Sequence, residues 1–252
     1  MCPSGARVVR PAIACLLLLA GCAGPARLGD RPAAAPSARP DSALVVLELR
    51  LQRSAELADA RGALRVFDQD VRVEYRAGGS GAGLDAGEVS LEGRSLRRVV
   101  DGKGGVSYRL GRDEPEGGTQ AGGEPWGTIA NTGGPRVLAA SVRVKLAPYP
   151  LVTRPTPGQG VARSEELPIV MLPPVPEVWY RVSLVGAGDP VSATDLGEGR
   201  WLFPSGSLAG LTPGRARVLI EVETSCGDCP GAGSMRANWS TRTDLELAVT
   251  LL

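Results

Sequence analysis

The chain has 252 residues, of which 43% are hydrophobic and 22% are charged, a composition that allows one or two globular domains with a buried core. With 34 glycines and 21 prolines, it favours short strands and frequent turns over long helices. A net charge of +1 offers no clustered basic excess for a phosphate backbone, and the absence of histidine excludes Ser-His-Asp, Cys-His and His-ligated zinc chemistry. We therefore expect an all-β protein without a nucleic-acid partner.

The N-terminus carries Arg7 and Arg10, followed by an apolar run over residues 11–19. A charged segment, a short apolar segment and then small residues are typical of a secretory signal. The apolar run is shorter than the roughly 20 residues that a helix needs to span a bilayer. A cleaved signal peptide is therefore favoured over a retained transmembrane helix.

The sequence Leu19-Ala20-Gly21-Cys22 resembles the lipobox of bacterial prolipoproteins, in which the cysteine is acylated and becomes the first residue of the mature protein. The resemblance implies a signal peptide over residues 1–21 and a lipid anchor on Cys22. Because Ala23 is not acidic, it also implies attachment to the outer membrane of a bacterial cell envelope. The alternative is an ordinary secretory signal that happens to end near a cysteine.

Residues 23–40 are rich in Ala, Pro and Arg and contain no aromatic or β-branched side chain. Such a composition cannot build a core, so we interpret residues 22–40 as the lipidated cysteine and a disordered tether.

Strand patterns begin after the tether, where apolar and polar residues alternate with a period of two. Alternation of this kind gives each strand one wet face, which is typical of antiparallel sheets. The stretch Ser54 to Gly62 lacks the pattern, and helix and loop both stay open there. The clearest strand segments are 47–52, 71–76, 89–92, 142–146, 218–223 and 245–249.

Two segments rich in Gly and Pro interrupt these patterns. Residues 111–125 predict a long exposed loop, and residues 148–157, with four prolines, are the candidate domain boundary. A weak internal echo between residues 89–110 and 182–203 supports two modules. We expect β-sandwich modules over residues 41–163 and 164–252.

The second module resembles the carboxypeptidase-regulatory-like or transthyretin-like β-sandwich modules, in which an aspartate, a glycine turn, an aromatic strand and then Leu, Pro and Gly follow one another. The residues that carry the resemblance are Thr194, Asp195, Gly197, Trp201, Leu208, Leu211, Pro213 and Gly214. It implies tandem antiparallel sandwiches of immunoglobulin-like or prealbumin-like type, and it carries no catalytic residue.

Catalytic motifs are missing from the sequence. A Ser-x-x-Lys system would need Ser at position 100 or 142, and both are Val. Lys103 is followed by Gly104 where a phosphate-binding loop needs Ser or Thr, and no G-x-G-x-x-G occurs. The sequence thus predicts no catalytic residue, no bound metal and no cofactor.

Cys226 and Cys229 form a C-x-x-C between a predicted strand and a Gly-rich turn. In an oxidising compartment this setting favours a structural disulfide at a hairpin tip. A redox-active dithiol, a reduced pair and an incomplete metal site are the alternatives, although two thiolates alone do not complete a zinc site.

Two further features could carry function. Asp68 and Asp70 are interpreted as part of a solvated turn between two strands, with a calcium site or a carboxylate acid-base pair as alternatives. Trp126, at the end of the predicted loop, is the candidate binding surface, with a core position as the alternative. The other tryptophans, Trp179, Trp201 and Trp239, are assigned mainly to cores and edges.

These inferences lead to one functional hypothesis. The chain is expected to be a lipid-anchored protein of the cell envelope that acts as a non-catalytic binding or scaffolding module, with the membrane and an unknown envelope protein or polysaccharide as partners. An enzyme that uses carboxylates on cell-wall or polysaccharide material is the alternative. A spacer without a ligand of its own is a third class.

Overall fold

The computed structural model describes residues 44–78, 81–110, 121–122, 125–172 and 175–252. Every described residue belongs to one compact unit. Cys22, the signal peptide and the tether predicted from the sequence lie outside the described residues. Throughout the described part the regular structure is β-strand, without an α-helix, which confirms the all-β prediction.

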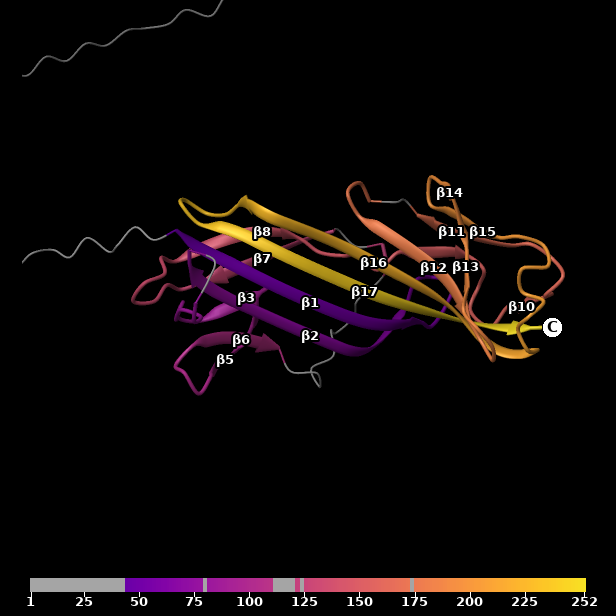
Figure 1. The fold of residues 1–252 in the computed structure, drawn as a ribbon, viewed down its shortest axis with the longest axis horizontal. Helices are drawn as coiled ribbons and strands as arrows, with labels where there is room; N and C mark the ends of the chain where they lie inside the picture. Colours follow the sequence, from indigo (N-terminus) through magenta and orange to yellow (C-terminus); the bar gives the residue numbers. More distant parts are fainter. Residues whose placement is uncertain (1–43, 79–80, 111–120, 123–124, 173–174) are drawn as a thin grey trace, which may run out of the picture. The chain divides into compact units, whose positions relative to one another are not determined.

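The largest sheet has nine strands, and Figure 1 shows that four of them, β1, β2, β16 and β17, are long. β1 and β17 run parallel, with Leu49 opposite Trp239, so this sheet is mixed rather than purely antiparallel. In order, its strands are β13 (Val191–Ser192), β12 (Trp179–Val185), β16 (Gly214–Pro230), β17 (Arg236–Leu251), β1 (Val45–Leu57), β2 (Leu64–Ala77), β6 (Val106–Leu110) and β5 (Arg97–Val100), with β10 (Gly160–Val161) beside β17.

Two smaller sheets, each of four antiparallel strands, complete the described fold. One has the order β4 (Arg94–Ser95), β3 (Val89–Leu91), β7 (Trp126–Asn131) and β8 (Ala140–Lys145). The other has the order β14 (Thr194–Gly197), β15 (Arg200–Phe203), β11 (Leu167–Leu172) and β9 (Leu151–Arg154).

Each small sheet packs on the inner face of the long sheet through its own apolar core. In the first core Leu49 and Val73 of the long sheet pack with Ile129 of β7. In the second core Ile220 and Leu247 of the long sheet form one cluster with residues of β9, β11 and β15, among them Val152, Ile169 and Phe203. Burying these alternate side chains is the main force that holds the sheets together.

The chain passes from one core to the other between Leu146, which belongs to the first, and Ala147, which belongs to the second. However, β1 contributes to both cores, and the start of β17 packs in the first while its remainder packs in the second. The division of the core therefore runs across shared strands.

A buried polar layer separates the two cores on β1 and β17. Arg53 of β1 donates a hydrogen bond to the carbonyl of Ala147, and its guanidinium lies 4.5 Å from the ring centroid of Tyr149. Thr241 Oγ1 accepts a hydrogen bond of 2.7 Å from the Ala147 amide, and Thr243 Oγ1 donates one of 2.7 Å to its carbonyl. The amide and the carbonyl of Ala147 therefore both have hydrogen-bond partners at the point where the chain passes from one core to the other, as a buried peptide group requires.

All six predicted strand segments lie within or largely within observed strands, namely β1, β2, β3, β8, β16 and β17. Between Ser54 and Gly62, the predictions of helix and of loop are both wrong for the first part, because β1 continues to Leu57 before the turn. The strand continues there because Ala55 and Leu57 enter the second core. Residues 148–157 contain β9, whose Val152 is buried in that same core.

Candidate functional site

Trp126, the candidate binding residue, is the first residue of β7 and lies opposite Lys145 of β8. Its side chain is 40% exposed, so the alternative of a core position is wrong. The guanidinium of Arg143 lies 5.1 Å from the ring centroid, and the ammonium of Lys145 lies 5.9 Å from it. Both distances are in the range of cation–π contacts, which fix the orientation of the indole at the surface.

Lys145 connects this tryptophan to another part of the chain. Although the residue is buried, its ammonium is satisfied, because it donates to the carbonyl of Pro176 and lies 3.1 Å from Glu177 Oε2. These two acceptors precede β12, the strand that begins at Trp179. The interaction holds the surface around Trp126 against the segment that enters the long sheet.

Trp179 repeats the arrangement of Trp126. It is 49% exposed, and the guanidinium of Arg181 lies 4.9 Å from its ring centroid. This exposure fits the edge alternative rather than the core one, because β13 pairs with β12 only at Ser183 and Leu184. The signal was present in the sequence, because Trp179 and Arg181 alternate with Val182 and Leu184, which are buried. Trp201, by contrast, is buried as expected.

The C-x-x-C lies at the end of β16, where Cys226 pairs with Trp239 and Cys229 pairs with Ala237 across a register shift. A disulfide joins the two cysteines, with their Cα atoms 6.0 Å apart. Within the bulge, the Asp228 amide donates a hydrogen bond of 2.6 Å to Asn238 Oδ1. The pair thus closes a bulge next to the hairpin rather than opening a helix, which is where redox-active C-x-x-C motifs lie.

The sequence predicted a turn at Asp68 and Asp70, but both residues lie within β2. They oppose Ser54 and Gln52 of β1, in the middle of a long antiparallel pair. The turn prediction failed because this strand keeps its pairing through polar residues. Among the residues that the structure describes, no group of three or more Asp, Glu, Cys or His side chains is placed to hold a metal ion.

A compact ion-pair network surrounds Arg242 on the outer face of β16 and β17. Its guanidinium contacts Glu221, Glu223 at 2.9 Å and Asp244 at 2.8 Å. Burial raises the pKa of Asp244 despite the neighbouring guanidinium of Arg242. The side chains of Glu221 and Asp244 are only 11% and 15% exposed, so Arg242 neutralises carboxylates that water reaches poorly.

The described surface also has two sizeable hollows. One of about 560 Å³ is lined by residues of β16 and β17 and of the turns beside them, including Arg215 and Arg217. The other, of about 380 Å³, is lined by residues of β2, β5 and β6 and of the turns beside them, including Arg72, Lys103 and Arg109. Both are open hollows with mixed polar and apolar linings, unlike typical small-molecule sites, which are enclosed and mostly apolar.

Comparison with known protein families and with curated proteins finds no match to this chain. Within the described ranges, no helix is long and apolar enough to cross a bilayer. The functional proposal is therefore based on the geometry of the surface.

Proposed function

We propose that the chain is a lipid-anchored protein of the bacterial cell envelope that binds another envelope component and does not catalyse a reaction. The observation that supports a binding role is the surface at Trp126, where Arg143 and Lys145 hold an exposed indole in a fixed orientation. Rigid aromatic side chains next to arginines are over-represented among residues that dominate binding energy.

The surface is built on regular strands, which favours precise recognition. Trp126 and Arg143 lie on adjacent antiparallel strands, and the Leu146 amide donates a 2.7 Å hydrogen bond to the carbonyl of Pro125. Adding a Cβ at Gly127 would place it 2.6 Å from Leu146 Cδ1, so this glycine leaves room for the Leu146 side chain. A partner would thus meet a preorganised surface, which reduces the entropy lost on binding.

The binding role is tested with the mature lipoprotein purified in detergent and mixed with isolated cell-wall sacculi or with solubilised outer membrane. Trp126→Ala should reduce the bound fraction at least tenfold, because truncated aromatic anchors cost roughly 2 kcal/mol or more. Trp179→Ala is the matched control, since Trp179 is similarly exposed beside an arginine. Equal binding by the wild type and Trp126→Ala contradicts the proposal.

The anchor is tested separately. Cys22→Ser should leave an uncleaved precursor that takes up no labelled fatty acid, whereas unchanged labelling contradicts the lipoprotein assignment. The enzyme alternative is tested by Asp68→Asn combined with Asp70→Asn: loss of turnover of an envelope polysaccharide by this folded variant replaces the binding role with a catalytic one.

A further inference from the structure

Four arginines lie in one row across four neighbouring strands of the long sheet. Arg97 of β5 is the direct cross-strand neighbour of Arg109 of β6, Arg109 is the neighbour of Arg72 of β2, and Arg72 is the neighbour of Arg50 of β1. All four are exposed. Because adjacent strands are about 4.8 Å apart, the arginine row is about 14 Å long.

Three carboxylates, Glu48, Asp70 and Glu74, flank the row on the same face, but in the described part of the chain only Glu74 contacts one of its arginines. Arg72 donates a hydrogen bond of 2.6 Å to Glu74 Oε1. Within the described part of the chain, the side chains of Arg50, Arg97 and Arg109 form neither a hydrogen bond nor an ion pair. Like charges directly opposite each other on a sheet are destabilising, and among the described residues the contact of Arg72 with Glu74 is the one direct ion pair that offsets this repulsion.

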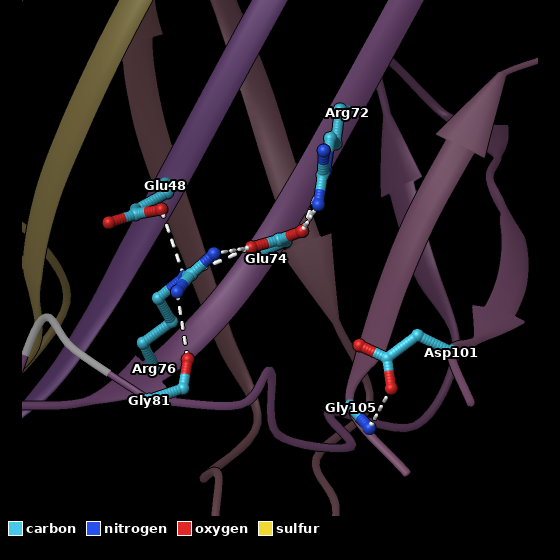
Figure 2. Close-up of polar contacts among 7 residues, drawn as sticks. All are labelled: Glu48, Arg72, Glu74, Arg76, Gly81, Asp101 and Gly105. Atoms are coloured by element: carbon cyan, nitrogen blue, oxygen red, sulfur yellow. Dashed lines mark hydrogen bonds and ion pairs between the residues drawn. The ribbon is translucent and has the colours of Figure 1, made fainter. Parts of the chain in front are cut away.

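The hollow of about 380 Å³ lies beside the row and is lined by Arg72 and Arg109 together with Arg76 and Lys103. The two carboxylates that line the hollow, Glu74 and Asp101, already accept hydrogen bonds from the protein. As Figure 2 shows, Glu74 lies between Arg72 and Arg76, and Asp101 accepts a hydrogen bond of 2.8 Å from the Gly105 amide.

The pKa values of these two carboxyl groups agree with that picture. Burial would raise the pKa of Glu74, but the hydrogen bonds from Arg72 and Arg76 outweigh it and lower the pKa. Hydrogen bonds from the amides of Gly105 and Lys103 lower the pKa of Asp101. Both groups are ionised and engaged, and the charge of Lys103 also acts on Asp101, so Arg109 is the cation of the hollow that contacts no carboxylate in the described part of the chain.

We propose that the arginine row binds a linear acidic polysaccharide of the uronate type, with carboxylates on one side of the glycan meeting arginines of the row. In a uronate chain with twofold symmetry, the carboxylates on one side recur at every second sugar, and the distance between neighbouring strands is similar to the length of one pyranose unit, so these carboxylates match guanidinium groups on alternate strands. A guanidinium fork also fits a carboxylate in bidentate geometry.

The surroundings of the row favour this ligand over a single-stranded nucleic acid. Proteins that bind single strands stack the bases on aromatic side chains, and none of the described positions next to the row on the same face is aromatic. Those positions hold Glu48, Gln52, Asp70, Glu74, Val99 and Ser107. The proposal depends neither on Trp126 nor on the lipid anchor, so it can fail while the proposed binding role at Trp126 stands.

The test uses the full mature protein in detergent and an oligogalacturonate long enough to cover all four arginines, with binding measured by isothermal titration. Arg97→Glu combined with Arg109→Glu should weaken binding about a hundredfold, roughly tenfold for each charge-assisted hydrogen bond that the substitutions remove. Raising the salt concentration should weaken wild-type binding, because the interactions are ionic. A methyl-esterified oligogalacturonate, which lacks the charges, should not bind.

The matched control is Arg215→Glu combined with Arg217→Glu, which changes the net charge equally on the outer face of β16 and should leave the affinity within about twofold. Arg97→Gln with Arg109→Gln, checked for an unchanged melting temperature, covers the case in which the charge reversal disturbs folding. Equal affinity of the charge-reversed protein and the wild type overturns the proposal. So does tighter binding of an oligothymidylate or of anionic lipid vesicles than of the oligogalacturonate.

Discussion

Two charged regions on the same face of the long sheet are organised in opposite ways. On β16 and β17, Arg242 lies among three carboxylates, Glu221, Glu223 and Asp244, and Arg181 of the neighbouring β12 lies 3.6 Å from Glu221. On β1, β2, β5 and β6, four arginines lie side by side, and only Arg72 contacts a carboxylate within the described chain. The first region satisfies its charges internally, whereas the second leaves positive charge directed to solvent.

The contrast separates charge that stabilises a fold from charge that is available to a partner. Removing a cation from a closed network leaves partly buried carboxylates without a counter-charge, which lowers the free energy of unfolding. Removing one from an open row relieves repulsion and costs the fold little. Substitutions in the two regions should therefore change stability by different amounts, and in one case with opposite sign.

The largest effect is expected for Arg242→Met. This substitution leaves Asp244 without its cation and Glu221 with only the longer 3.6 Å contact to Arg181, and we expect a loss of about 2 kcal/mol in the free energy of unfolding, less than for a fully buried pair because Arg242 is 37% exposed. Urea unfolding at neutral pH measures it. Arg109→Met, the same change in the open row, is the control and should shift the free energy by less than about 0.5 kcal/mol. Equal losses in the two variants would remove the contrast.

The sequence could predict which of these charged residues face outward, but not which of them become neighbours. Alternation along each strand shows which residues face outward, so Arg72, Glu74 and Glu221 could be placed on wet faces from the sequence. Which outward residues become neighbours depends on register. The arginine row joins positions 50, 72, 97 and 109, and the pairing of β1 with β17 joins the two ends of the described chain. Such distant pairings are set by packing of the whole sheet.

The same limit explains the other differences. The tryptophan at position 126 was a candidate from its place beside a Gly-rich segment, but its cations Arg143 and Lys145 come from a neighbouring strand, and the acceptors of Lys145 lie about 30 residues further along. Asp68 and Asp70 look like turn residues locally, whereas the pairing of β2 with β1 keeps them in a strand. Tertiary pairing overrode local preference at Asp68 and Asp70, and it supplied the cations beside Trp126.

The next largest effect is expected for Glu74, which binds Arg72 of the open row and the neighbouring Arg76. Its pKa is lowered in the folded protein, so its contribution to stability is present above the unfolded pKa and is lost as the pH falls through the folded pKa. Glu74→Gln should therefore lower the free energy of unfolding by about 1.5 kcal/mol at pH 7, and the difference from the wild type should vanish in acid. Urea unfolding across the acidic range checks this. A difference that stays constant with pH contradicts the ionic role of Glu74.

The smallest effect concerns repulsion within the row. At low salt Arg109→Met should stabilise the protein by about 0.3 kcal/mol, because it removes one like-charged neighbour from Arg72 and from Arg97. At about 1 M salt, where charges are screened within about 3 Å, the gain should disappear. Paired thermal unfolding of the variant and the wild type at the two salt concentrations measures it. A stabilisation that persists at high salt would have another cause.

The most direct test of the claim that the open row receives a partner is amide hydrogen exchange with and without the oligogalacturonate. Bound ligand should slow exchange in β5 and β6, which carry Arg97 and Arg109, and leave β16 and β17 around Arg242 unchanged. Slower exchange confined to β16 and β17, or unchanged exchange throughout at a saturating concentration of the oligogalacturonate, would contradict the account.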